Sequence, residues 1–191
     1  MYLYLSSSII EYLKNRKKGH VAYFFFDGRG SRQELQLHHQ LLRSLIIQLA
    51  GHCGAGIPLA LVDLHKQCGN GHQEPSLNDL QGALQLILKE NFPLQTYIVI
   101  DALDECTEQE KTLKWIKEIE AANLHLIVTS RPLPNIATIL ENLDWHYVDM
   151  AKSKNVDIAA YIDLHVGKLG KWNEETQKNI QLVLIKGAQG M

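Results

Sequence analysis

Long apolar runs are missing from this sequence of 191 residues. The longest aliphatic or aromatic run extends from Val21 to Phe26, whereas a membrane-spanning helix needs about 20 mostly apolar residues. The apolar start of the chain also lacks the basic residues and the cleavage site of a signal peptide. We therefore expect no membrane-spanning segment and no membrane partner.

Cysteine is scarce, and the three cysteines Cys53, Cys68 and Cys106 form no CxxC pair. An odd number without such a pair argues against a disulfide framework. The pattern favours a reducing setting, and we expect a cytoplasmic protein.

An excess of charge of one sign is also missing. Nineteen Lys and Arg residues stand against 21 Asp and Glu residues, which gives a net charge of −2, and no segment carries a long run of one sign. A basic face that could neutralise phosphate backbones is not apparent, so nucleic acid is not an expected partner. Gly and Pro together supply 18 of the 191 residues (13 plus 5), too few for a linker-like or collagen-like chain. With 46% hydrophobic residues, the composition is that of a globular protein.

Segments with strand and helix character alternate along the chain. Apolar runs predict buried strands at 21–26, 97–100, 124–129 and 147–150. Periodic apolar residues predict helices at 5–14, 32–50, 59–66, 107–122 and 136–142, a helix between Ser76 and Pro93, and only helices from 155 onward. Ser76 is an expected N-cap, and Thr107 with Glu110 fits a capping box. Buried strands that alternate with helices predict an α/β fold with a parallel sheet covered on both faces.

The most informative segment is Tyr97-Ile-Val-Ile-Asp-Ala-Leu-Asp-Glu105. In open parallel sheets, ligands bind at the carboxyl ends of the strands, where Asp101 ends an apolar strand and Asp104 and Glu105 follow. Such a gathering of carboxylates is costly unless it meets a cation, and Mg²⁺ prefers one or two carboxylates with phosphate oxygens and water. Asp101 is thus a candidate metal ligand, and Asp104 or Glu105 could orient an attacking water. The alternative is an ordinary acidic helix start, where carboxylates are favoured anyway.

The next predicted strand ends in Thr129-Ser-Arg-Pro132. An arginine at this tip could reach a phosphate and sense its presence. The alternative is a surface arginine before a proline turn. Together with the acidic end of the preceding strand, the segment favours a phosphate-binding role for Ser130 and Arg131.

These motifs together resemble the NACHT-type STAND nucleoside triphosphatases, in particular the nephrocystin-type N-terminal domains abundant in fungal proteins. The similar segments are Ala22–Asp27 (second strand), Leu41–Leu49 (following helix), Ile98–Cys106 (Walker B), Leu126–Pro132 (sensor 1) and Val156–Ile162 (start of the helical region). The resemblance implies a P-loop NTPase core at 1–150 and the start of a helical region at 151–191. It also implies Asp101 as the Mg²⁺ residue, Asp104 and Glu105 as the catalytic acidic pair, and Arg131 as the sensor.

The family's phosphate-binding loop, GxxxxGK[ST], does not occur in the sequence. That loop supplies a backbone N–H nest, a lysine for the phosphates and a hydroxyl for Mg²⁺. The segment Leu5–Leu13 is similar to the helix that follows the loop. We expect that the chain begins just after the loop, without the family's first strand, and that it stops inside the helical region, as a truncated gene product or partial gene model would. Intact relatives use Mg²⁺ with ATP or GTP, and we expect weak or no nucleotide binding here.

A histidine- and cysteine-rich connector offers a different chemistry. His52, Cys53, His65, Cys68 and His72 lie close in sequence, and the last three have a loosely zinc-like spacing. A structural connector without metal is the other interpretation. Cys106 is expected to be a buried spectator thiol, because neighbouring carboxylates would raise its pKa.

Three functions from different classes remain open. The first is a fragment of a STAND/NACHT nucleotide-dependent signalling switch that keeps Walker B and sensor 1; such switches are often associated with ankyrin repeats in family members. The second is a degenerate, non-enzymatic module that pairs with protein partners, a second copy or intact relatives through exposed sheet edges or its helical surface. The third is a zinc-stabilised binding domain.

Overall fold

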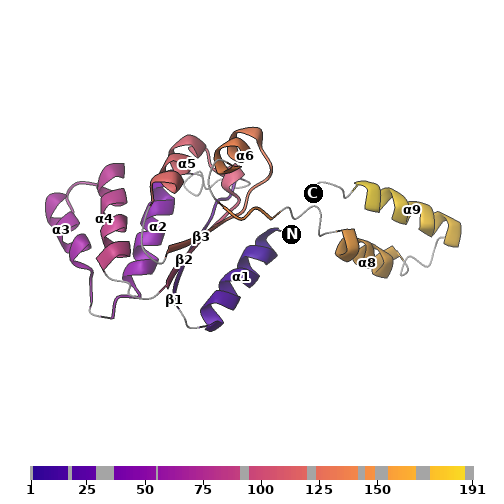
Figure 1. The fold of residues 1–191 in the computed structure, drawn as a ribbon, viewed down its shortest axis with the longest axis horizontal. Coiled ribbons are helices and arrows are strands. Elements are labelled where there is room, and N and C mark those ends of the chain that lie inside the picture. The colour runs from indigo at the N-terminus through magenta and orange to yellow at the C-terminus, as the bar shows by residue number, and fades with distance from the viewer. Residues whose placement is uncertain are drawn as a thin grey trace. The chain divides into compact units, whose positions relative to one another are not determined.

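The computed structural model describes residues 2–16, 19–28, 37–54, 56–90, 95–119, 124–141, 145–148, 155–166 and 173–187. The chain divides into two compact units, Met1–Leu143 and Asp144–Met191. The elements of the first unit, labelled in Figure 1, are α1 (Tyr2–Arg16), β1 (Gly19–Phe25), α2 (His38–Ala50), α3 (Leu59–Gln67), α4 (Leu77–Glu90), β2 (Gln95–Asp101), the 3₁₀ turn η2 (Leu103–Glu105), α5 (Gln109–Glu118), β3 (Leu124–Val128) and α6 (Pro134–Glu141). Those of the second are α8 (Asn155–Val166) and α9 (Glu174–Gly187), which pack against each other. None of the described helices has the length and apolar character needed to cross a membrane.

The three described strands form one parallel sheet in the order β1-β2-β3. Phe25 is in register with Asp101, and Ile100 with Val128, so all three strands end at the same edge. Gly19 permits the close approach at the start of β1, because a Cβ atom there would lie 2.1 Å from the Gln95 carbonyl oxygen. The prediction of an α/β fold with a parallel sheet and flanking helices is confirmed.

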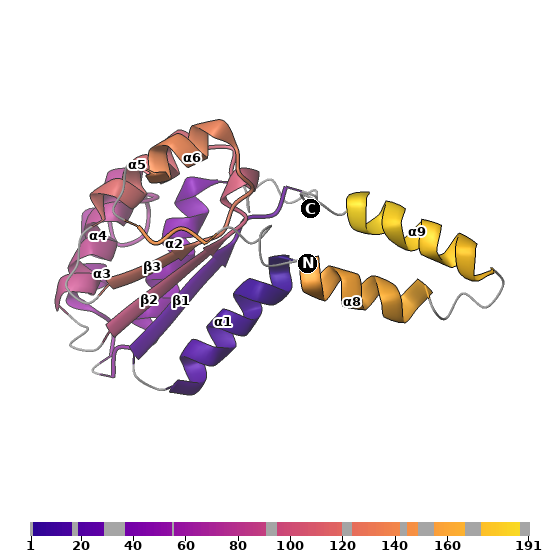
Figure 2. The same cartoon turned by 45° about the vertical axis from the view of Figure 1, so that its right-hand side comes forward.

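Helices cover the sheet on opposite faces, as Figure 2 shows for α1 on one side and α2 on the other. Ile10 of α1 packs with Val21 and Val99 in a buried cluster. Because strand residues alternate between faces, Ala22 and Phe24 point to the other side, which α2 covers. β1 and β2 therefore contain buried residues, as their apolar runs predict, whereas β3 is only half-buried and its His125 is exposed. The prediction of a buried strand at 124–129 is wrong in this respect, because β3 is an edge strand of the described sheet.

The outer edge of β1 is closed by a side chain at its centre. The Gln48 amide nitrogen donates to the Tyr23 carbonyl at 2.7 Å, and the Tyr23 N–H donates to the Gln48 amide oxygen at 3.1 Å. This carboxamide occupies the hydrogen-bonding positions that a neighbouring strand would use. At the other edge, β3 has a strand neighbour on one side only within the described part of the chain.

Two local predictions are wrong and one is confirmed. α5 begins after Glu108 rather than at Thr107, because the Glu108 carboxylate accepts the His38 N–H at 3.0 Å across the fold. Tyr147 and Val148 are strongly exposed and lie outside any strand of the described residues, so they lack the burial that the strand prediction requires. Ser76 does cap α4: its hydroxyl accepts the Asp79 N–H at 3.3 Å and its own N–H donates to the Asp79 carboxylate at 2.9 Å.

Boundaries of the other predicted elements shift by a few residues. The helix predicted over 32–50 is observed from His38, and residues 29–36 lie outside the described ranges. In the predicted strand over 147–150, residues 149 and 150 also lie outside them. The division of the chain at residue 150 stays a prediction.

Candidate functional site

Asp101 is the last residue of β2 and is buried on the face of the sheet that α1 covers. Its Oδ1 atom accepts hydrogen bonds from two hydroxyls, those of Ser6 on α1 and of Thr129, the latter at 2.6 Å. Two donors on one oxygen fix the orientation of the carboxylate. In the described part of the chain these bonds both go to Oδ1, which leaves Oδ2 as the oxygen that could face a ligand.

The chain turns sharply after Asp101. Ala102 adopts the left-handed conformation, with φ of 55° and ψ of 49°, and its N–H donates to the Thr129 hydroxyl at 3.1 Å. The Leu103 N–H donates to the Thr129 carbonyl at 3.0 Å. A non-glycine residue in this region costs about 1–2 kcal/mol, which these bonds to Thr129 offset. The turn brings Asp104 and Glu105 back to the tip of β3.

Arg131 holds both of these carboxylates. Its Nε atom lies 3.0 Å from Asp104 Oδ2, its backbone N–H donates to Asp104 Oδ1 at 3.0 Å, and its terminal nitrogen lies 3.4 Å from Glu105 Oε1. The Arg131 side chain is 66% exposed, while those of Asp104 and Glu105 are 7% and 16% exposed. The guanidinium is thus the accessible side of this ion-pair network.

Glu105 also contacts the end of β1. Its Oε2 atom accepts the Gly28 N–H at 2.6 Å. The ends of all three strands are therefore joined through three carboxylates. Ser130, predicted as a phosphate contact, instead donates its hydroxyl to the Arg131 carbonyl at 2.8 Å.

The donor set at this edge is compatible with Mg²⁺ at one position only. Asp101 offers a single carboxylate, which suits an ion that takes one or two carboxylates and completes its shell with water and phosphate oxygens. Asp104 and Glu105 are paired with a cation already, so a second cation beside Arg131 would be repelled. Among the described residues, no three or more His, Cys, Asp or Glu side chains are grouped so that they could hold a metal ion. A Mg²⁺ ion at Asp101 would therefore depend on water and phosphate oxygens for its other ligands.

The histidine- and cysteine-rich connector does not form such a metal-binding group either. Its five predicted ligands all belong to the described residues. The His52 ring lies 5.0 Å from the His20 ring, and Cys53 Sγ lies 3.7 Å from the Leu49 carbonyl oxygen. The connector therefore does not gather its side chains into a zinc site.

A comparison with protein families assigns the chain. The family model described as nephrocystin 3, N-terminal, matches residues 3–131. The chain belongs to this family. The matched segment includes Ser6, the acidic turn and Thr129, and it ends at Arg131. The resemblance to nephrocystin-type N-terminal domains is thereby confirmed, whereas a search of the curated proteins found no match.

Behind the acidic turn of this nephrocystin-type domain lies a buried polar network that the sequence patterns did not reveal. The His38 ring, on α2, has its Nδ1 atom 3.1 Å from the Thr112 hydroxyl and its Nε2 atom 3.4 Å from the Gln81 amide nitrogen. Cys106 Sγ lies 3.4 Å from the same Thr112 hydroxyl, and burial raises the pKa of the thiol. Cys106 is therefore a buried thiol of this network, as predicted, and not a nucleophile.

Proposed function

We propose that this domain is the nucleotide-responding part of a STAND/NACHT-type signalling switch. The observation that carries the proposal is the Arg131 guanidinium, which is exposed at the tip of β3 and paired with Asp104 and Glu105. Thr129, two residues before it, bonds the carboxylate of Asp101. A cation that two carboxylates hold at the ligand-binding edge of a parallel sheet is suited to exchange those partners for a phosphate.

Each residue of this edge has a distinct part in the proposal. Asp101 would hold Mg²⁺, and the ion would supply neutralisation of phosphate charge. Arg131 would bind the terminal phosphate of ATP or GTP, with Ser130 beside it. Asp104 and Glu105, released from Arg131, would be free to orient a water molecule. While Arg131 holds them, the two carboxylates are occupied, so the paired arrangement would correspond to the resting state.

The missing GxxxxGK[ST] sequence limits what these residues can do on their own. Without a backbone nest and a lysine for the phosphates, nucleotide affinity depends on Arg131 and the Mg²⁺ ion. We therefore expect weak, Mg²⁺-dependent binding by this chain and little or no hydrolysis.

The test measures binding of fluorescent ATP and GTP analogues to the full chain, with and without Mg²⁺. Asp101→Asn should weaken the Mg²⁺-dependent binding by about tenfold, while Asp63→Asn, at an exposed carboxylate on α3, should not change it. Binding that is absent at millimolar nucleotide, or that is equal in both variants, contradicts the proposal. Sequencing the 5′ end of the transcript is a second test, because an in-frame strand with GxxxxGK[ST] would supply the missing groups.

A non-enzymatic interaction module is the second candidate, and the open edge of β3 favours it. Within the described residues, β3 pairs with β2 alone. The Thr129 N–H bonds to the Ile100 carbonyl at 2.9 Å, so by alternation the Leu126 N–H points away from β2. A partner strand could bond there.

Replacement of Leu126 by proline removes that outward N–H and keeps the bonds to β2. If the chain associates through β3, this variant should sediment as a smaller species than the wild type. Leu126→Val keeps the N–H and serves as the control. Equal sedimentation of both variants and the wild type contradicts strand pairing at this edge.

A further inference from the structure

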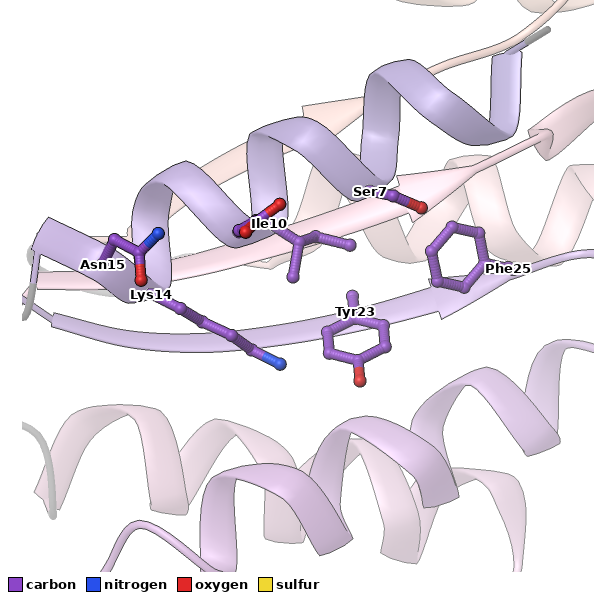
Figure 3. Close-up of a pocket in the computed structure, with 7 residues that line it drawn as sticks. Ser7, Ile10, Lys14, Asn15, Tyr23 and Phe25 are labelled. Carbon is purple, nitrogen blue, oxygen red and sulfur yellow. The ribbon is translucent and has the colours of Figure 1, made fainter.

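A pocket of about 370 Å³ lies between α1 and β1, and none of the acidic-turn residues Asp101, Asp104, Glu105 and Arg131 lines it. Figure 3 shows six of the side chains that line it: Ser7, Ile10, Lys14, Asn15, Tyr23 and Phe25. Glu11 completes the lining. Because only these two elements contribute, the pocket is a groove with two walls, open along its remaining side.

The floor of the groove is aromatic. The Tyr23 and Phe25 rings meet edge to face, with centroids 5.7 Å apart and an interplanar angle of 70°. Both rings are half-buried and pack beside Ile10, which is buried. A third ring could join such a pair in an offset or edge-to-face arrangement, the geometry that aromatic side chains prefer.

The rim of the groove is basic at one end. The Lys14 ammonium lies 4.6 Å from the centre of the Tyr23 ring and is the basic group of the lining. Glu11 is the single acid in the lining, and no ion pair joins it to Lys14 in the described part of the chain. An ammonium held over a ring at the mouth of an apolar groove attracts a carboxylate that lies next to an inserted ring.

The length of the groove and its closed strand edge favour a peptide that binds through its side chains. Ser7 and Lys14 are two turns apart on α1, or about 10 Å, which corresponds to about three residues of extended chain. Strand addition is excluded at this point, because Gln48 already bonds both the N–H and the carbonyl of Tyr23.

We propose that this groove binds a segment of a partner protein in which an aromatic side chain is flanked by carboxylates. The aromatic ring packs against the paired rings of Tyr23 and Phe25, and a flanking carboxylate pairs with the Lys14 ammonium. Ser7 and Asn15 offer hydrogen bonds to the backbone of the segment. This site is independent of the nucleotide switch proposed above.

The experiment is a titration of the ¹⁵N-labelled full chain, followed by NMR, with three peptides. Acetyl-Glu-Phe-Glu-amide should shift the amide signals of Ile10, Tyr23 and Phe25. Acetyl-Glu-Ala-Glu-amide, which lacks the ring, should bind about tenfold more weakly. Acetyl-Lys-Phe-Lys-amide, with the charges reversed, should bind about fivefold more weakly.

Two matched pairs of variants assign the binding to the groove. Lys14→Glu should remove the preference for the acidic peptide, while Lys89→Glu, an equal charge change at an exposed position of α4, should keep it. Phe25→Leu should weaken binding, while Tyr97→Leu, at an aromatic residue of the neighbouring strand outside the lining, should not. No shifts at millimolar peptide, equal binding of all three peptides, or shifts confined to another surface would overturn the proposal.

Discussion

Lowering the pH should destabilise the fold through one buried residue, His38. The residue is 0% exposed, and its Nε2 atom faces the Gln81 amide nitrogen. An amide nitrogen is a donor, so Nε2 must accept and the imidazole must be neutral, with its proton on Nδ1 directed at the Thr112 hydroxyl. Burial lowers the pKa of His38 from 6.5 to about 4, although the Glu108 carboxylate partly opposes the shift.

The magnitude follows from the two protonation equilibria. Between pH 6.5 and about 4, the unfolded chain takes up a proton at this residue and the folded chain does not, so stability falls as the pH falls. At about pH 5 the loss is about 2 kcal/mol relative to neutral pH. Above pH 6.5 the imidazole is neutral in both states, and His38 contributes no pH dependence.

Urea unfolding at about pH 7.5 and about pH 5 measures this loss. His38→Gln should reduce the difference between the two pH values by about 2 kcal/mol relative to the wild type, while His39→Gln, at the half-exposed neighbouring position, should leave most of it in place. A loss of stability of the His38 variant at both pH values does not affect the test, since only the difference between the two pH values counts. Equal pH dependence in the wild type and the His38 variant would refute the reasoning.

Other perturbations have expected effects that are smaller or of a different kind. Arg131→Met should destabilise the fold by less than about 1 kcal/mol in urea, because the side chain is largely exposed; a loss of several kcal/mol would show that the ion pairs are structural. Gln48→Leu should cost about 1–3 kcal/mol, because it leaves the N–H and carbonyl of Tyr23 without their partner, and Gln48→Glu should recover part of the loss as an acceptor. A thiol reagent followed by peptide mass spectrometry should modify the half-buried Cys53 before the buried Cys106, and the reverse order would contradict the buried network.

The predicted positions of the strands and of the acidic site follow from local patterns. Apolar runs bounded by turn residues identify β1 and β2 because a strand buried on both faces must be apolar throughout. The apolar run of β3 gives its position correctly, although the strand is only half-buried. The juxtaposition of Asp101, Asp104 and Arg131 follows from the parallel arrangement, since carboxyl ends of parallel strands share one edge. Both inferences require only the order of the strands and helices along the chain.

The contacts that patterns could not predict join residues far apart in sequence. Ser6 and Asp101 are separated by 95 positions, and His38 and Thr112 by 74. Which hydroxyl reaches the carboxylate depends on how α1 crosses the sheet, and periodicity does not determine that angle. The start of α5 also involves a contact between residues far apart in sequence, because Glu108, the residue before the helix, accepts the N–H of His38 at the start of α2 in addition to pairing with Lys111 of its own helix.

The closed edge of β1 has a consequence for the size of any assembly. A sheet with two open edges can add copies without end, as in a fibre, because each added strand presents a new edge. Here Gln48 satisfies the backbone of Tyr23 at the centre of one edge, so a continuous ladder cannot form along β1 and, of the described strands, β3 is the favoured edge for addition. Two copies joined at their β3 strands would each turn a closed edge outward. Association by this route would therefore favour a dimer over a fibre. The residue responsible for this limit would be Gln48.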